Sequence, residues 1–235
     1  MRIIWMGMVA ALVASPVWAE RISHRYDMSV AGIRLASAAI AGEVTPEGYA
    51  LAARVEARGL AGFFAGDLDA QARGRRSGQV FTPARFEQES EERDGPERLV
   101  LGYVQGVPVS ADYTPARGPD EKPIPPLGRQ GGTVDYLTAI LTLTFPGTPE
   151  EICARRVDAF TFTKRTRIVG EGVVMQGGVP TCRVSYRDVD PETLVPDDDV
   201  DSYTLTLRPL GDGRHEVAEI SGPTEFGRAR ITRTD

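Results

Sequence analysis

Apolar and polar residues alternate with a period of two along much of this chain, and this alternation restricts the fold more than any other feature of the sequence. In residues 49–58 the apolar residues occupy every second position, and the segments 24–30 and 202–208 repeat the pattern. Phe160 and Phe162 begin a further segment of this kind. Strands with one buried face have such a pattern, and they are typical of antiparallel sheets. The sequence therefore predicts an all-β protein.

Short clusters rich in glycine, proline and acidic residues separate the predicted strands. Each cluster is short enough to join two neighbouring strands, as at 46–48, 94–96, 177–178, 211–213 and 222–223. On this basis we expect about ten strands. We predict that they form one strongly curved antiparallel sheet or an open β-barrel.

One segment departs from the strand pattern. Residues 135–145 are dominated by apolar residues and threonine, and the segment ends before Pro146 and Gly147. Thr133 or Asp135 can serve as the N-cap of a helix, and the apolar residues that follow form one helical stripe. A buried strand is the alternative interpretation. We expect a helix that plugs one end or face of the curved sheet.

The first nineteen residues have the pattern of a secretory signal that is cleaved after Ala19. Arg2 precedes an apolar run from Ile3 to Val13. No later segment approaches the ~20 apolar residues of a membrane-spanning helix. We therefore expect residues 20–235 to form a single periplasmic domain without a transmembrane segment. A proline-rich loop over 114–132 is expected to lie exposed near the midpoint of the chain.

The chain has two cysteines, Cys153 and Cys182. In an oxidising compartment such a pair usually forms a disulfide bond. A redox-active pair and two free thiols are the alternatives, but the C-x-x-C spacing that tunes thiolate chemistry is absent. We predict a structural disulfide between these residues.

The segment from Gly59 to Gly66 is an apolar patch framed by glycines. Its phenylalanines could fill the core from a hairpin or short helix, or they could form a flap over an apolar cavity. For the second case the candidate ligand-binding residues are Leu60, Phe63 and Phe64. Small residues on a concave face leave room for a ligand. The candidates for this lining are Ala53, Ala57, Ala70, Ala72 and Gly74.

Familiar catalytic, metal-binding and nucleotide-binding motifs are absent from the sequence. His24 and His215 are isolated in predicted strands, where structural roles are expected rather than a metal site. The acidic run 197–201 alternates like a calcium loop but lacks that loop's glycine and glutamate, so a solvated turn is favoured over weak calcium binding. The net charge of −6 argues against nucleic acid as a partner. We assign no catalytic residue, metal or cofactor.

The chain combines four features: the Val30-Ala31-Gly32-Ile33 turn between the strands of 26–41, the link 57–60, the proline-rich midpoint followed by 134–139, and the late Cys182. In this combination the chain resembles the DUF3108 family of exported bacterial proteins over nearly its whole mature length. It departs in having Asp135-Tyr136 where an Asp-Pro step is expected. The resemblance implies a fold and a compartment and transfers no catalytic residue. The expected architecture is also similar to periplasmic lipoprotein carriers, whose curved sheet wraps an apolar cavity.

Three hypotheses for function follow from these features. The first is a noncatalytic periplasmic protein that binds an apolar or amphipathic ligand, such as a lipid or acyl chain, in envelope maintenance. The second is a scaffolding protein that docks an envelope partner through a sheet edge or the loop 114–132. The third is an enzyme acting on a glycan, which needs two carboxylates about 5 to 9.5 Å apart in a cleft. The absence of catalytic motifs and the Phe63-Phe64 patch favour the first hypothesis.

Overall fold

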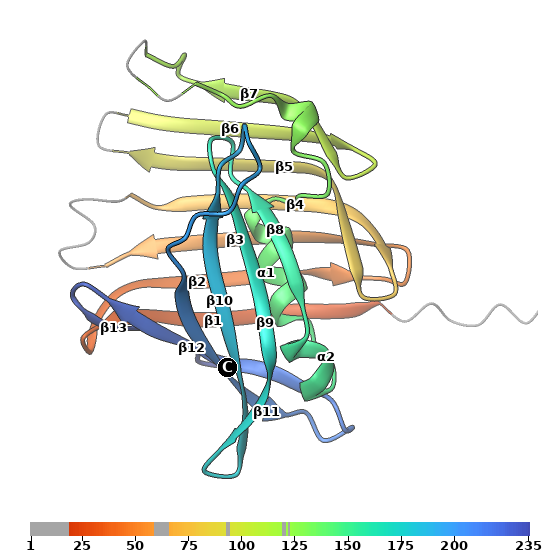
Figure 1. The fold of residues 1–235 in the computed structure, drawn as a ribbon, viewed down its shortest axis with the longest axis vertical. Coiled ribbons are helices and arrows are strands. Elements are labelled where there is room, and N and C mark those ends of the chain that lie inside the picture. The colour runs from red at the N-terminus through yellow and green to blue at the C-terminus, as the bar shows by residue number, and fades with distance from the viewer. Residues whose placement is uncertain (1–18, 59–65, 93–94, 119–120, 122) are drawn as a thin grey trace, which may run out of the picture.

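The computed structural model describes residues 19–58, 66–92, 95–118, 121 and 123–235, and within them thirteen strands form a single antiparallel sheet (Figure 1). The predicted all-β fold with one curved sheet and a helix is thus confirmed, and the sheet is not closed into a barrel. More strands are present than the sequence predicts, because charged residues obscure the alternation in segments such as 80–92. The strands are β1 (Glu20–Val30), β2 (Ile33–Val44), β3 (Gly48–Ala57), β4 (Leu68–Ser77), β5 (Val80–Glu92), β6 (Gly95–Val104), β7 (Val107–Thr114), β8 (Arg156–Phe160), β9 (Arg165–Gln176), β10 (Val179–Val189), β11 (Asp201–Pro209), β12 (His215–Thr224) and β13 (Gly227–Arg233).

The order of the strands in the sheet is β7-β6-β5-β4-β3-β2-β1-β13-β12-β11-β10-β9-β8. The first seven strands and the last six are therefore two meanders, and the pairing of β1 with β13 joins them. Tyr26 lies opposite Arg233 in this pairing, and Val30 lies opposite Ala229. Strands β7 and β8 are left as the two edges, and the segment between them crosses the concave side of the sheet.

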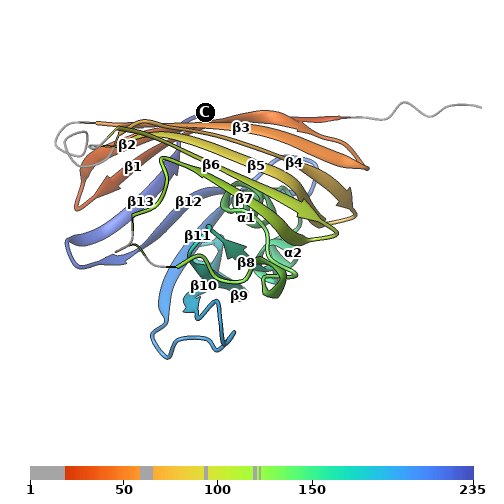
Figure 2. The same cartoon turned by 90° about the horizontal axis from the view of Figure 1, so that it is seen from above.

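The sheet is strongly curved, and its curvature creates the concave face. Figure 2 shows β1–β7 as one arched layer, with α1 (Tyr136–Thr144) between this layer and β8–β10. Register shifts interrupt five of the strand pairs, between β1 and β2, β4 and β5, β6 and β7, β9 and β10, and β11 and β12. Such irregularities bend and twist a sheet locally, so they support this curvature.

The inward faces of the strands follow the predicted alternation. Along β3, Tyr49 and Leu51 are buried, whereas the alternating residues Ala50 and Ala52 are exposed. On β11, Leu205 and Leu207 are likewise buried. The period-two pattern therefore identifies the concave face correctly in both meanders.

Helix α1 occupies the segment that the sequence predicts, and Asp135 is its N-cap. The Asp135 carboxylate accepts hydrogen bonds from the Thr138 N–H at 2.8 Å and from the Thr138 hydroxyl at 2.7 Å. Thr138 Oγ1 lies 2.7 Å from the Tyr49 hydroxyl of β3. These three side chains are buried, so the same hydrogen bonds that start the helix also tie it to the sheet.

The other end of α1 is capped by an arginine. Arg155 donates hydrogen bonds to the carbonyl oxygens of Leu143 and Phe145. Burial of its guanidinium lowers the pKa of Arg155 to about 10. A cation at this position satisfies carbonyl groups that have no partner within the helix and opposes the negative end of its dipole.

The residues on either side of α1 cover the β8 edge and carry the disulfide. Val134 forms a parallel bridge with Ala159, so the β8 edge is partly paired. The short helix α2 (Pro149–Cys153) was not predicted, although its Thr148-x-x-Glu151 capping box is a sequence signal for a helix start. The predicted disulfide is confirmed, and it joins Cys153 at the end of α2 to Cys182 on β10.

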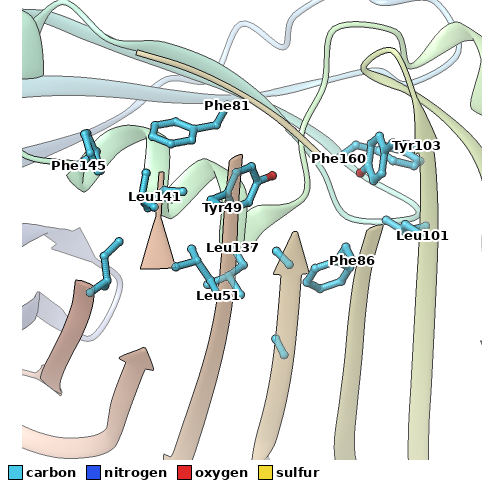
Figure 3. Packing of buried hydrophobic residues seen from close by; sticks show 14 of the residues in the cluster. Tyr49, Leu51, Phe81, Phe86, Leu101, Tyr103, Leu137, Leu141, Phe145 and Phe160 are labelled. Atoms are coloured by element: carbon cyan, nitrogen blue, oxygen red, sulfur yellow. The ribbon is translucent and has the colours of Figure 1, made fainter. Parts of the chain in front are cut away.

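The main hydrophobic core lies between α1 and the concave face of the first meander. Figure 3 shows Leu137 and Leu141 of α1 among side chains of the sheet. The buried members of this cluster are Ile22, Val44, Tyr49, Leu51, Ala70, Ala72, Phe81, Phe86, Leu99, Leu101, Tyr103, Leu137, Leu141, Phe145, Phe160 and Phe162. A second cluster surrounds the disulfide. The connection predicted at 114–132 is mostly exposed in its described part, but it contains the 3₁₀ helix η2 (Leu127–Arg129) and the buried Gln130.

Asp135 should make the stability of the protein depend on pH. Burial raises the pKa of its carboxyl to about 6 in the folded protein, against about 3.9 in an unfolded chain. The folded state therefore binds this proton more tightly, and the contribution of Asp135 to the free energy of unfolding falls by about 3 kcal/mol as the pH rises from about 4 to above 6. Asn keeps the N-cap but does not titrate, so Asp135→Asn should become more stable relative to wild type over this interval. Urea unfolding at about pH 4 and pH 7 measures this change, and an equal difference at both pH values would contradict it.

Loss of the disulfide should destabilise the protein without changing its fold. The bond links residues separated by 29 positions, and the chain-entropy model assigns about 3 to 4 kcal/mol to a loop of this length. We expect the Cys153→Ala, Cys182→Ala double variant to lose about that much free energy of unfolding in urea titrations. A loss below about 1 kcal/mol would show that the two clusters hold this region without the cross-link.

Candidate functional site

The centre of the concave face is filled by α1, so it leaves no room for a ligand. The predicted lining residues Ala70 and Ala72 are buried in the same cluster as Leu137 and Leu141. A Cβ atom at Gly74 would lie 2.7 Å from the Tyr49 hydroxyl and 2.2 Å from the Thr82 carbonyl oxygen. The space left between α1 and strands β1–β3 is only about 10 Å³. The small residues here make room for a helix and for Tyr49.

A larger cavity lies at one side of this core, between β5–β7, the start of α1 and the residues that follow β8. Its volume is about 440 Å³, within the usual range for a small-molecule site. We call it the β5–β7 cavity. The described residues that line it are Phe86, Gln88, Ser90, Glu97, Leu99, Tyr113, Arg117, Glu121, Tyr136, Thr161, Phe162 and Thr163.

Aromatic side chains from four separate segments form the walls of the β5–β7 cavity. Phe86 of β5 and Tyr136 of α1 meet edge to face, with ring centroids 4.9 Å apart. Tyr113 of β7 stacks on Phe162, with centroids 5.4 Å apart. The Arg117 guanidinium lies 5.9 Å from the Tyr113 centroid and 5.2 Å from that of Phe162. These contacts hold the walls in fixed orientations.

The strand register explains why these residues meet. Phe86, Gln88 and Ser90 alternate along β5, so they share its concave face. Gln88 lies opposite Leu99, and Leu99 in turn lies opposite Tyr113. The wall from the sheet is therefore one continuous row across three strands, and α1 brings Tyr136 against it.

Two hydroxyl groups in the cavity wall are buried without a hydrogen-bond partner among the described residues. They belong to Ser90, which is 6% exposed, and to Tyr136. Burial, together with the nearby Asp135 charge, raises the pKa of Tyr136, so its hydroxyl stays protonated at neutral pH. Buried polar groups are almost always paired in proteins, so two such hydroxyls in one wall call for an explanation.

Each charged residue of the cavity has a partner within the lining. The Tyr113 hydroxyl is hydrogen bonded to Glu97, and burial together with this bond raises the pKa of Tyr113 to about 12. Arg117 and Glu121 form an ion pair at 3.2 Å. The Glu121 side chain is 45% exposed, which places it at the rim. The aromatic side chains therefore share the lining with polar and charged groups, and Glu121 lies at the mouth.

Phe162 has an unusual backbone conformation for a bulky residue. Its φ is +69°, although it is 4% exposed and therefore held in the core. A non-glycine residue in this region costs of order 1–3 kcal/mol and persists only where its surroundings fix it. The stack with Tyr113 and Arg117 supplies such surroundings. The strain places the Phe162 ring in the cavity wall.

Of the residues predicted to bind a ligand, the structure describes Ala53 and Ala57. Leu60, Phe63 and Phe64 lie outside the described residues. Ala53 is half-buried and packs against the main core, and Ala57 is half-buried at the end of β3. Neither of these alanines lines the cavity.

Other hollows and candidate sites offer less. A hollow of about 480 Å³ lies beside Arg165 and Asp188, and its described lining contains no aromatic side chain. No group of three or more His, Cys, Asp and Glu side chains within the described ranges is placed to hold a metal ion. His24 lies 3.8 Å from Asp235, and His215 pairs through its backbone with Gly147. Among the helices of the described residues, none is long and apolar enough to cross a membrane.

Sequence reasoning missed the cavity because its walls come from segments that are distant in the chain. Phe86 and Tyr113 lie in strands with weak alternation, and Tyr136 was assigned only to the stripe of the helix. The pair Phe160 and Phe162 was the one local signal for a wall residue. Phe160 is the last residue of strand β8, and Phe162 lies beyond the strand. Neither the register of β5–β7 nor the crossing of α1 can be read from that pair.

Comparisons with protein-family models, with curated proteins and with solved structures found no match to this chain. The resemblance to the DUF3108 family therefore stays a prediction. The case for a function depends on the β5–β7 cavity itself.

Removing a hydroxyl that has hydrogen-bond partners should change stability more than removing one that has none. Thr138→Val removes the hydroxyl that lies between the Asp135 carboxylate and the Tyr49 hydroxyl. Both groups then lose a buried hydrogen-bond partner, which should lower the free energy of unfolding by about 2 to 4 kcal/mol. Ser90→Ala removes a hydroxyl that has no partner among the described residues, so stability should change by less than about 0.5 kcal/mol or rise. Urea titration of both variants tests this, and a large loss in Ser90→Ala would contradict the unpaired state of Ser90.

Proposed function

We propose that this protein is a noncatalytic binding protein for a small apolar or amphipathic molecule, and that the β5–β7 cavity is its site. The observation that carries the proposal is a cavity of about 440 Å³ with aromatic walls and two buried hydroxyls that lack partners in the described chain. Ligand sites are commonly clefts of about 300 to 1,000 Å³ in which placed polar groups fix the orientation of the ligand.

The chemistry of the walls suggests the parts of the ligand. Phe86, Leu99 and Phe162 suit a hydrocarbon or ring system. Ser90 and Tyr136 can donate or accept a hydrogen bond once a small side-chain rotation brings their hydroxyls to a ligand. A molecule with an apolar body and one polar end, such as a lipid or acyl chain, matches this combination.

The exported location expected from the leader belongs to the same proposal. The disulfide between Cys153 and Cys182 is of the kind that forms and persists in oxidising compartments. A periplasmic protein that holds an acyl chain or lipid away from water would serve maintenance of the envelope.

A carboxylate-based enzyme is less well supported by the same cavity. Glu97 and Glu121 both line it, but each is already engaged, by the Tyr113 hydroxyl and by Arg117. A general acid in glycoside hydrolysis is usually kept protonated by a desolvated environment. The 45% exposure of Glu121 does not provide one.

Filling the cavity should remove the ligand. We would export the protein, purify it without detergent and analyse organic extracts by mass spectrometry. Gln88 is half-buried and lines the cavity, so Gln88→Trp places a large ring inside it. We expect wild type to carry a stoichiometric apolar or amphipathic molecule and the variant to lose at least about 90% of it.

Gln71→Trp is the matched control for this experiment. Gln71 lies on the neighbouring strand β4, opposite Glu87, and its side chain is exposed on the other face of the sheet. This variant should keep the ligand. If wild type carries no ligand and also fails to bind N-phenyl-1-naphthylamine, a neutral apolar fluorophore, the proposal is wrong and the scaffolding hypothesis takes its place.

A further inference from the structure

The two most exposed large apolar side chains in the described part of the chain lie on adjacent turns. They are Phe226, which is 81% exposed, and Ile33, which is 68% exposed. Phe226 is in the turn between β12 and β13, and Ile33 follows the turn between β1 and β2. Neither side chain contributes to a core cluster. Their exposure therefore has no explanation in the packing of the fold.

The two turns are held side by side by the pairing of β1 with β13. Ala31 donates its N–H to the Arg228 carbonyl oxygen at 3.0 Å. A Cβ atom at Gly227 would lie 3.1 Å from the Ala31 Cβ. Figures 1 and 2 both show these hairpin ends projecting together from the same side of the sheet. The turns are tight, because positive φ angles at Ala31, Gly32 and Gly227 allow very short connections.

Arginines surround the two apolar side chains. Arg228 and Arg230 are exposed on β13, and Arg34 follows Ile33 directly. Arg228 is hydrogen bonded to the Ser221 hydroxyl at 3.4 Å, and Arg34 pairs with the half-buried Asp27. The three arginines outnumber the two acidic residues at this end of the hairpins, Asp27 and Glu225, so this end carries a small positive charge. The chain as a whole carries a charge of −6.

The shape of this feature fits a lipid surface better than a protein. A stable protein interface buries about 800 Å² on each partner, which two side chains on narrow projecting turns do not supply. Apolar side chains on a protrusion can enter the boundary between headgroups and acyl chains, while neighbouring arginines remain at the charged headgroups. An aromatic ring is favoured at that boundary.

We infer that the adjacent turns carrying Ile33 and Phe226 dock this protein reversibly on an anionic lipid surface. Strands β1 and β5 both end on this side of the first meander, so Ser90 near the end of β5 places the β5–β7 cavity toward the same end. The docked protein would then present this end of the sheet to the bilayer. The inference stands on the exposed turns and does not require the cavity to hold a ligand.

Vesicle co-sedimentation tests the inference. The exported, detergent-free protein is mixed with vesicles of phosphatidylethanolamine and phosphatidylglycerol, and separately with phosphatidylcholine vesicles. We expect binding to the anionic vesicles, weaker binding at high salt, and little binding to phosphatidylcholine. The Ile33→Ser, Phe226→Ser double variant should lower the partition coefficient at least about tenfold.

Val80→Ser is the control, because Val80 is 64% exposed at the turn between β4 and β5, at the other end of the strands. This variant should bind anionic vesicles like wild type. Absence of vesicle binding, equal binding to phosphatidylcholine, or unchanged binding in the double variant would each overturn the inference. Circular dichroism and urea titration of the double variant establish that it is folded, and its exposed positions make that outcome expected.

Discussion

The packing of α1 against the concave face of the sheet is the interaction on which the rest of the structure depends. A helix of nine residues is too short to be stable alone in water, so it forms because Leu137 and Leu141 enter the core and Asp135 caps it. The same contacts give the first meander its hydrophobic interior. The Asp135 carboxylate, Thr138 and the Tyr49 hydroxyl form one buried chain of hydrogen bonds. These bonds fix the position of the helix start on the sheet.

This packing also decides where space remains on the concave face. The sequence predicts a helix that plugs one end or face of the curved sheet, and in the structure the helix packs on the concave face. The remaining space is displaced toward β5–β7, where Phe86, Tyr113, Tyr136 and Phe162 surround it. The protein therefore has an off-centre cavity with four aromatic side chains in its lining, and the exposed turns at 31–33 and 225–226 lie toward the same end of the sheet.

The candidate site could be predicted only in part. The helix, its Asp135 N-cap and the disulfide were within reach, because capping residues, apolar runs and a lone pair of cysteines are local or countable signals. The site residues were not, because Ala70 and Ala72 have the same sequence pattern whether they face a ligand or a helix. Ser90 and Tyr136 have no unusual neighbours in the sequence, and their hydroxyls stand out only once burial and missing partners are known.

The sequence by itself determined the all-β class, the inward face of most strands and helix α1, since side-chain period and turn chemistry are properties of short segments. Only the tertiary structure decided that β1 pairs with β13, that α1 fills the centre of the concave face, and that four distant segments enclose the β5–β7 cavity. These features depend on strand order and curvature. They arise from contacts between residues far apart in the chain, which alternation along a strand does not encode.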